Sequence, residues 1–240
     1  AAAGENVSEG KVGAGAGCTV GKLYGRARAM RGGQGTASVR VAGRCTVGVL
    51  IVVNAVGDVV DPGTGRVIAG TRGEDGVFVG PEAWLAPPDP NTDSAGALPA
   101  KGGSAGGINS TDELPERTDD PPDLSDLNTT IGVVSTDAPL TKEQAQRVAW
   151  MAHDGLARAI RPAHTLLDGD TLFVLATGRA GRAAGDMASP AADKYPAPLT
   201  PRAVSAIGAA AADVVVAAIV RAVRAATSLP GLPAARQTQR

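Results

Sequence analysis

One hydroxyl residue, Thr129, stands at a sharp boundary in the composition of this chain. Residues 86–127 before it are rich in Pro, Gly, Ser and Asp, whereas residues 130–136 after it are largely apolar and β-branched. Breakage of the Asn128–Thr129 bond would place a free α-amine beside the Thr129 Oγ, and a threonine with an N-terminal amine is an activated nucleophile. An Asn-Thr-Thr sequence before a strand is also the ordinary composition of a turn, so spacing alone leaves both interpretations open.

Two carboxylates, Asp168 and Asp170, flank a glycine just before a second apolar run, residues 172–176. In this position they can bind a metal, end a turn, or hold a catalytic amine. Metal binding requires more ligands close by, and His164 supplies only one, which argues against a metal site. His153 and His164 suggest a Ser-His-Asp triad, but no Gly-x-Ser-x-Gly elbow between a strand and a helix accompanies them, so we expect both histidines to be structural.

The first 36 residues are rich in Gly, which raises the question of a phosphate-binding loop. A Walker sequence requires Gly at position 16 and Ser or Thr after Gly21-Lys22, whereas Ala16 and Leu23 stand there. The dinucleotide pattern also fails, because no third Gly follows Gly15-Ala-Gly17 at the required spacing. Tight turns and close strand approach explain these glycines, and Lys22 is either a surface residue or part of a site.

Composition and charge exclude several classes of protein. The net charge is −1 and aromatic residues make up 2% of the chain, which argues against a nucleic-acid partner. Cys18 and Cys45 lie far apart, so two buried free thiols are expected. The first ten residues lack the features of a signal peptide, and we expect a cytoplasmic location. Ala203–Val220 is alanine-rich and contains Asp213, which is typical of a core helix and not of a membrane span, so no membrane association is expected.

Patterns of apolar residues predict the elements. Strands are predicted over residues 36–42, 45–53, 66–69, 130–136 and 172–176. Helices are predicted from Thr141 to about Arg161 and from Thr200 to about Thr227. Asp58 and Asp61 are predicted to be turn residues, and residues 230–240 to be a frayed tail. Residues 86–127 contain too few apolar residues to form a core, which predicts a linker or disordered loop. Strands combined with amphipathic helices indicate a layered α/β protein.

Several longer motifs occur in order along the chain: Val53–Pro62, Asn128–Val134 (NTTIGVV), Met151–His164 (MAHDGLARAIRPAH) and Leu167–Thr171 (LDGDT). They resemble the self-cleaving L-aminopeptidase D-amidase/esterase family of N-terminal-nucleophile hydrolases. That family also contains β-peptidyl aminopeptidases and the endo-type 6-aminohexanoate-oligomer (nylon oligomer) hydrolase. The resemblance covers roughly residues 10–80 and 128–225.

The resemblance implies a fold and a division of the chain. It implies a four-layer αββα sandwich of the N-terminal-nucleophile-hydrolase kind, incomplete at the N-terminus because family members carry a further segment before the point where this sequence starts. Self-cleavage would leave a larger part, residues 1–128, with a core to about residue 85 and the linker 86–127. The smaller part would be residues 129–240, and both parts together would form one structural domain.

The resemblance also implies roles for individual residues. Thr129 is the implied nucleophile, released by cleavage after Asn128, and the Asn54 amide helps to hold the oxyanion. Lys22 matches an active-site lysine of the nylon-oligomer-hydrolase branch, and Asp168 and Asp170 accept hydrogen bonds from the nucleophile's amine and hydroxyl. The aminopeptidase branch has Ser-x-Glu in place of this Asp-x-Asp, so the motif favours the nylon-oligomer-hydrolase branch. No cofactor and no metal are implied.

The expected function is hydrolysis of amide bonds in small peptide or oligoamide substrates by a homo-oligomer of processed heterodimers. L-peptides, D-amino-acid amides, β-peptides and aminohexanoate oligomers all remain open as substrates. Two alternatives stand beside this function. One is acyl transfer of the ornithine-acetyltransferase kind, which also uses a processed threonine. The other is an inactive binding or structural remnant that lacks the front segment of the family.

Overall fold

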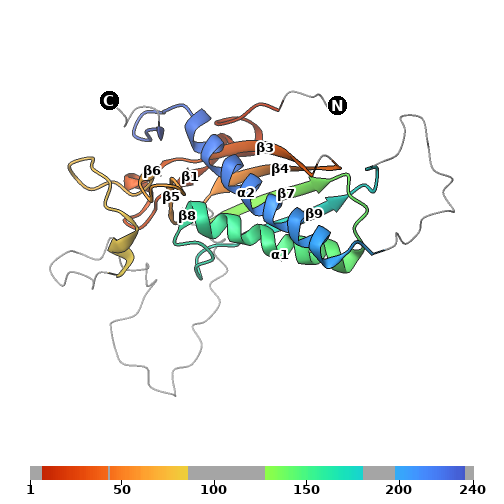
Figure 1. Ribbon diagram of the computed structural model, residues 1–240. Coiled ribbons are helices and arrows are strands. Elements are labelled where there is room, and N and C mark those ends of the chain that lie inside the picture. Colours follow the sequence, from red (N-terminus) through yellow and green to blue (C-terminus); the bar gives the residue numbers. More distant parts are fainter. Residues whose placement is uncertain (1–6, 43, 86–127, 181–197, 236–240) are drawn as a thin grey trace, which may run out of the picture.

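The structure, a computed structural model, describes residues 7–42, 44–85, 128–180 and 198–235 (Figure 1). The strands are β1 (Thr19–Val20), β2 (Met30–Arg31), β3 (Gly33–Val41), β4 (Cys45–Asn54), β5 (Asp58–Val60), β6 (Val67–Ala69), β7 (Thr129–Thr136), β8 (Ile160–Arg161) and β9 (Thr171–Ala176). The α-helices are α1 (Lys142–Ala159) and α2 (Pro201–Ala225), and the short 3-10 helices are η1 (Gly13–Gly17), η2 (Arg26–Arg28) and η3 (Pro81–Leu85). Residues 86–127, predicted to be a linker, lie outside the described residues.

The largest sheet joins strands from both sides of the Asn128–Thr129 bond. Its order is β3-β4-β7-β9, with β3, β4 and β7 antiparallel and β9 parallel to β7. Two smaller sheets, β6-β5-β8 and β1-β2, lie at one end of it (Figure 1). The parallel pair is connected through α1, as a parallel connection requires a crossover.

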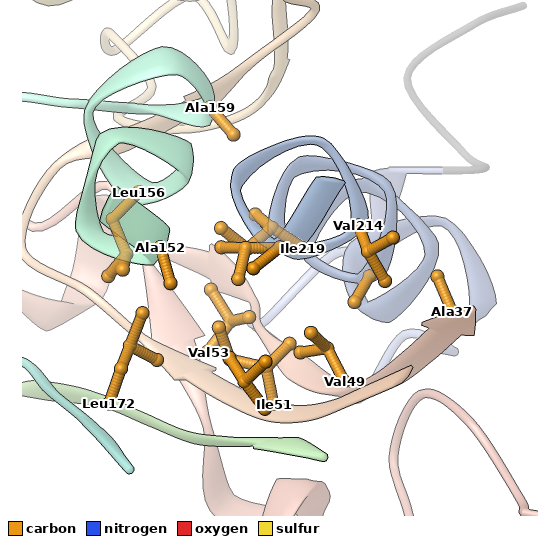
Figure 2. Close-up of a cluster of buried hydrophobic side chains, with 14 of the residues drawn as sticks. Ala37, Val49, Ile51, Val53, Ala152, Leu156, Ala159, Leu172, Val214 and Ile219 are labelled. Carbon is orange, nitrogen blue, oxygen red and sulfur yellow. The ribbon is translucent and has the colours of Figure 1, made fainter. Parts of the chain in front are cut away.

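The core lies between the large sheet and the two helices (Figure 2). Alternate residues of β4 point toward the helices, so Val49, Ile51 and Val53 are buried while Leu50 is exposed. The α2 backbone approaches β3 so closely that a Cβ at Gly35 would collide with the carbonyl oxygen of Ala218. Gly35 therefore allows close packing of β3 against α2, as predicted for the glycines of this region.

The opposite face of the large sheet is apolar and exposed. Phe173 and Leu175 of β9 are 56% and 58% exposed, and Leu50, Ile131 and Val133 on the neighbouring strands lie on the same face. The described residues thus confirm a layered α/β fold and form one helix layer on one large sheet. They do not themselves form the second large sheet and second helix layer that a four-layer sandwich places on such a face.

The helices agree well with the sequence pattern. The capping box of α1 is present, since the Thr141 hydroxyl accepts from the Gln144 N–H and the Gln144 side chain accepts from the Thr141 N–H. The helix ends at Ala159, two residues before the predicted end, because β8 pairs with β5. Among the described helices, α2 is long and apolar enough to cross a membrane by length and composition alone, but 50% of this stretch is buried inside the protein, as expected for a core helix.

The cysteines, the C-terminal tail and Asp61 each had a predicted environment. Cys18 and Cys45 are both free and buried, as predicted. The expectation of a frayed tail is wrong for residues 230–235, because Ala234 and Ala235 are buried and the Pro233 carbonyl accepts a hydrogen bond from the Arg31 N–H. Asp61 is a turn residue, as expected, and accepts from the amides of residues 63 and 64.

Asp58 is not a turn residue, contrary to the sequence prediction. It belongs to β5 and is fully buried, with 0% of its surface exposed. Its Oδ1 accepts from the Thr71 N–H and hydroxyl at 2.7 and 3.1 Å, whereas its Oδ2 has no partner within hydrogen-bond distance. Burial raises the pKa of this carboxyl to about 6, although the hydrogen bonds from Thr71 act in the opposite direction.

Asp58→Asn is expected to change how stability depends on pH. A carboxyl whose pKa is raised by folding contributes stability below its unfolded pKa, and this contribution is lost as the pH rises through the folded value, here from 3.8 to about 6. The variant lacks this loss. The difference between its free energy of unfolding and that of the wild type should therefore rise by up to about 3 kcal/mol between roughly pH 4 and 7. Urea denaturation at several pH values measures the difference. Parallel curves for the two proteins would contradict the burial of a charged Asp58, and Asp75→Asn, at an exposed carboxylate, is the control.

Candidate active site

Thr129 and Asn54 lie directly opposite each other at the ends of β7 and β4. Directly paired residues of antiparallel strands point to the same face of a sheet. Here that face is the exposed one, because alternation along β7 also brings Ile131 and Val133 to it. The Thr129 hydroxyl donates to the carbonyl oxygen of Asn128 at 2.5 Å, so the hydroxyl lies against the peptide bond that precedes its own residue.

Lys22 lies between the two asparagines of the site. Its Nζ donates to the Asn128 Oδ1 at 2.6 Å, to the Asn54 Oδ1 at 3.0 Å and to the Asn54 carbonyl at 3.2 Å. The loop before it is held in place by the hydrogen bond from the Gly21 N–H to the Gly57 carbonyl at 3.0 Å, and Gly21 has a φ of +71°. The structure thus places Lys22 beside the other candidate residues and not on the open surface.

The environment of Lys22 changes its proton affinity. Burial lowers its pKa to about 8, while the nearby negative charge of Asp168 acts in the opposite direction. All three of the hydrogen bonds described above are to neutral oxygens, which compensate an ammonium less than a paired carboxylate would. A substantial fraction of the Lys22 side chain is therefore neutral slightly above neutral pH.

The Asn54 amide is oriented by its neighbours. Its Oδ1 accepts from the Thr19 N–H at 3.0 Å, from the Thr19 hydroxyl at 3.4 Å and from Lys22. Three donors on one side identify that end of the amide as the oxygen, so the Nδ2 end is directed elsewhere. Thr19 was not recognised from the sequence, because nothing in a short strand far along the chain indicates that its amide contacts Asn54.

The segment with Asp168 and Asp170 runs alongside the Asn128–Thr129 bond. A bridge pairs Asn128 with Asp168, and the Gly169 N–H donates to the Asn128 carbonyl oxygen at 2.9 Å. This carbonyl therefore accepts from both Gly169 and the Thr129 hydroxyl. A side chain at position 169 would crowd the Thr129 Oγ, since a Cβ would lie 2.9 Å from it.

The two carboxylates have different partners in the uncut chain. Asp168 accepts from the Val56 N–H at 3.1 Å and from the Thr165 hydroxyl at 2.6 Å. Asp170 accepts from the Thr130 N–H at 2.8 Å, one residue beyond the proposed nucleophile. Asp168 thus holds the backbone after β4, and Asp170 holds the backbone of β7.

Two histidines extend the contacts of Asp170. The His164 Nδ1 lies 3.0 Å from the Asp170 Oδ2, and the His164 Nε2 lies 3.3 Å from the His153 Nδ1. Sequence reasoning treated both histidines as structural and noted only that His164 is close to the carboxylates in sequence. Among the described residues, no three His, Cys, Asp or Glu side chains gather closely enough to hold a metal ion.

Asp168→Asn is expected to lower the pKa of Lys22 further, below about 8, because the Asp168 charge opposes the effect of burial. The amide retains an oxygen that can accept from the Val56 N–H, so the loop can stay in place. A pH titration of the lysine side-chain NMR signals measures the change, with the exposed Lys142 as the reference signal. An unchanged Lys22 titration in the variant would show that the carboxylate does not act on this amine.

Comparisons with known proteins identify the family of this chain. Residues 1–236 match the family described as peptidase family S58. An uncharacterized aminopeptidase of Mycobacterium tuberculosis strain H37Rv is 42% identical over 238 residues, covering 98% of this chain and 58% of that protein. An uncharacterized aminopeptidase of Mycobacterium leprae is 42% identical over 229 residues, covering 95% of this chain and 52% of that protein. The chain therefore spans little more than half the length of these curated relatives.

Solved structures show the same fold. A β-aminopeptidase from Burkholderia sp. aligns with a TM-score of 0.52 and 28% identity, over 92% of this chain and 48% of that chain. The L-aminopeptidase D-Ala-esterase/amidase of Ochrobactrum anthropi, described as a variant of the Ntn hydrolase fold, aligns with a TM-score of 0.53 and 23% identity, over 92% of this chain and 46% of that chain. These likenesses confirm the expected α/β fold, and the match over residues 1–236 shows that the chain belongs to peptidase family S58.

Proposed function

We propose that this chain belongs to a self-processing amide hydrolase that cuts its own Asn128–Thr129 bond and then uses Thr129 as an N-terminal nucleophile. The observation that carries the proposal is the contact of the Thr129 hydroxyl with the Asn128 carbonyl, 2.5 Å between the oxygens. Membership in peptidase family S58 and the aminopeptidase relatives support peptidase or amidase chemistry.

Self-cleavage begins with attack of the Thr129 Oγ on the Asn128 carbonyl carbon. A C–Oγ ester bond forms, the C–N peptide bond breaks, and the hydroxyl proton ends on the released amine. The carbonyl oxygen carries negative charge in the transition state, and the Gly169 N–H already lies 2.9 Å from it as a donor. Water then hydrolyses the ester, which leaves a carboxylate on Asn128 and restores the Thr129 hydroxyl.

Lys22 assists this step in the proposed mechanism. Its Nζ holds the Asn128 side chain at 2.6 Å, which fixes the residue on the acyl side of the bond. Because its pKa is about 8, both its ammonium form and its neutral amine form are available to the reaction near neutral pH.

Turnover uses the new α-amine of Thr129 as the base. Its unperturbed pKa of about 7.7–8.0 lies close to the working pH, where a general base is most effective. Thr129 Oγ attacks the substrate carbonyl, the amine passes the hydroxyl proton to the leaving amine, and water releases the acyl group as an acid. In this proposal the Asn54 Nδ2 donates to the oxyanion, and Asp168 and Asp170 hold the amine.

Small peptides or oligoamides are the proposed substrates. The threonine nucleophile with Asp168 and Asp170 supports the nylon-oligomer-hydrolase branch over the branch with Ser-x-Glu. We further propose that the processed chains, 1–128 and 129–240, stay together and assemble into a homo-oligomer. The two parts share the β4–β7 ladder, which supports their remaining associated after cleavage.

Thr129→Ala in the full-length protein is expected to abolish both self-cleavage and amide hydrolysis, because it removes the only atom proposed to attack either carbonyl. Intact mass and N-terminal sequencing measure cleavage, and the wild type should yield a fragment beginning Thr129-Thr130-Ile131. Ser135→Ala is the matched control, because this hydroxyl lies on the same strand at the end away from the site. A Thr129→Ala protein that still cleaves itself would contradict the assignment of Thr129 as the nucleophile.

The products distinguish the remaining alternatives. Wild-type protein that is cut and releases free acid from an amide substrate supports hydrolysis. Transfer of the acyl group to an added amine, without free acid, would instead indicate an acyltransferase of the ornithine-acetyltransferase kind. A full-length wild type that stays uncut and inactive would indicate a binding or structural relative.

A further inference from the structure

Asp170 is held from both sides. Its side chain is only 2% exposed, and its Oδ1 accepts from the Thr130 N–H at 2.8 Å. Its Oδ2 contacts the His164 Nδ1 at 3.0 Å and the His164 backbone N–H at 3.2 Å. His164 in turn contacts His153 of α1 at 3.3 Å. A chain of polar contacts therefore runs from α1 to the first amide after the proposed nucleophile.

The donors and acceptors in this chain can be assigned by elimination. A carboxylate only accepts, so the His164 Nδ1 must carry a proton. In a neutral His164 the Nε2 is then an acceptor, and the His153 Nδ1 must donate to it. If both rings were protonated, two N–H groups would face each other across 3.3 Å, so the pair can hold at most one extra proton without breaking this contact.

We propose that His164, braced by His153, is a positioning residue that holds Asp170 against the Thr130 amide and thereby fixes the nucleophile Thr129. This inference rests on the proposed function and adds two residues to its site. Cleavage would turn Thr129 into a chain terminus, and free termini lose order unless they are tied down. The Thr130–Asp170 bond is one of the first ties after the new terminus, so the orientation of Asp170 controls where the Thr129 Oγ lies.

The surroundings of His153 disfavour its protonated form. Burial lowers the pKa of His153, and a positive charge on His164 lowers it further, whereas Asp170 and Asp154 act in the opposite direction. A histidine whose pKa is lowered by folding contributes stability above its unfolded pKa of about 6.5, and that contribution is lost as the pH falls. Burial of His153 therefore disfavours a second proton on the pair.

The backbone of His164 offers a sharp set of variants. His164 has a φ of +57°, a conformation that Gly and Asn adopt readily. His164→Gly removes the ring without backbone strain, while His164→Asn retains an N–H at the place of Nδ1. In the full-length protein, His164→Gly should lower kcat and the self-cleavage rate roughly 10–100-fold at unchanged KM, and His164→Asn should stay within about threefold of wild type.

Hydrogen exchange of the Thr130 amide tests the same inference without activity. Its protection should fall in His164→Gly and persist in His164→Asn, and both variants should unfold at a similar temperature. Equal rates for His164→Gly and wild type, or equal losses in both variants, would overturn the proposed role. If the wild type shows no cleavage or hydrolysis, the proposed function fails, and the exchange of Thr130 still decides whether His164 positions Asp170.

Discussion

The antiparallel pairing of β4 with β7 is the constraint on which the rest of the structure depends. It places Asn54 opposite Thr129 and joins the parts of the chain on either side of the Asn128–Thr129 bond in one sheet. Register matters strongly here, because a slip of one residue would turn every side chain of β7 to the other face. Thr129 would then point into the helix-covered core, and Ile131 would be buried with it.

The same strands separate stability from chemistry by their alternation. Residues of β4 that point to the helices, such as Val49 and Ile51, form the core with α1 and α2 (Figure 2). The alternate residues point to the outer face, and Asn54 is the last of them at the end of β4. A substitution on the outer face can therefore alter the site without opening a cavity in the core, because its side chain points away from the helices.

Neutral polar groups, more than charge pairs, organise the candidate site. Lys22 is surrounded by amide and carbonyl oxygens, and the Asn128 carbonyl accepts from an amide and a hydroxyl. Neutral partners hold the lysine in place without stabilising its charge as much as a bound carboxylate would, so burial dominates its pKa. Asp170 differs, because it contacts His164, which in turn contacts His153 of α1.

The sequence by itself determined the local elements and the candidate residues. Apolar, β-branched runs, the capping box at Thr141 and the proline after Thr200 located β4, β7, β9 and both helices, because these signals depend on neighbours a few residues apart. Motif resemblance selected Thr129, Asn54, Lys22, Asp168 and Asp170. Only the tertiary structure decided that Lys22 bridges two asparagines, that Asp58 is buried in a strand, and that His164 contacts both Asp170 and His153. Such contacts join residues far apart in the chain, and composition and spacing carry no record of them until the strands and helices pack together.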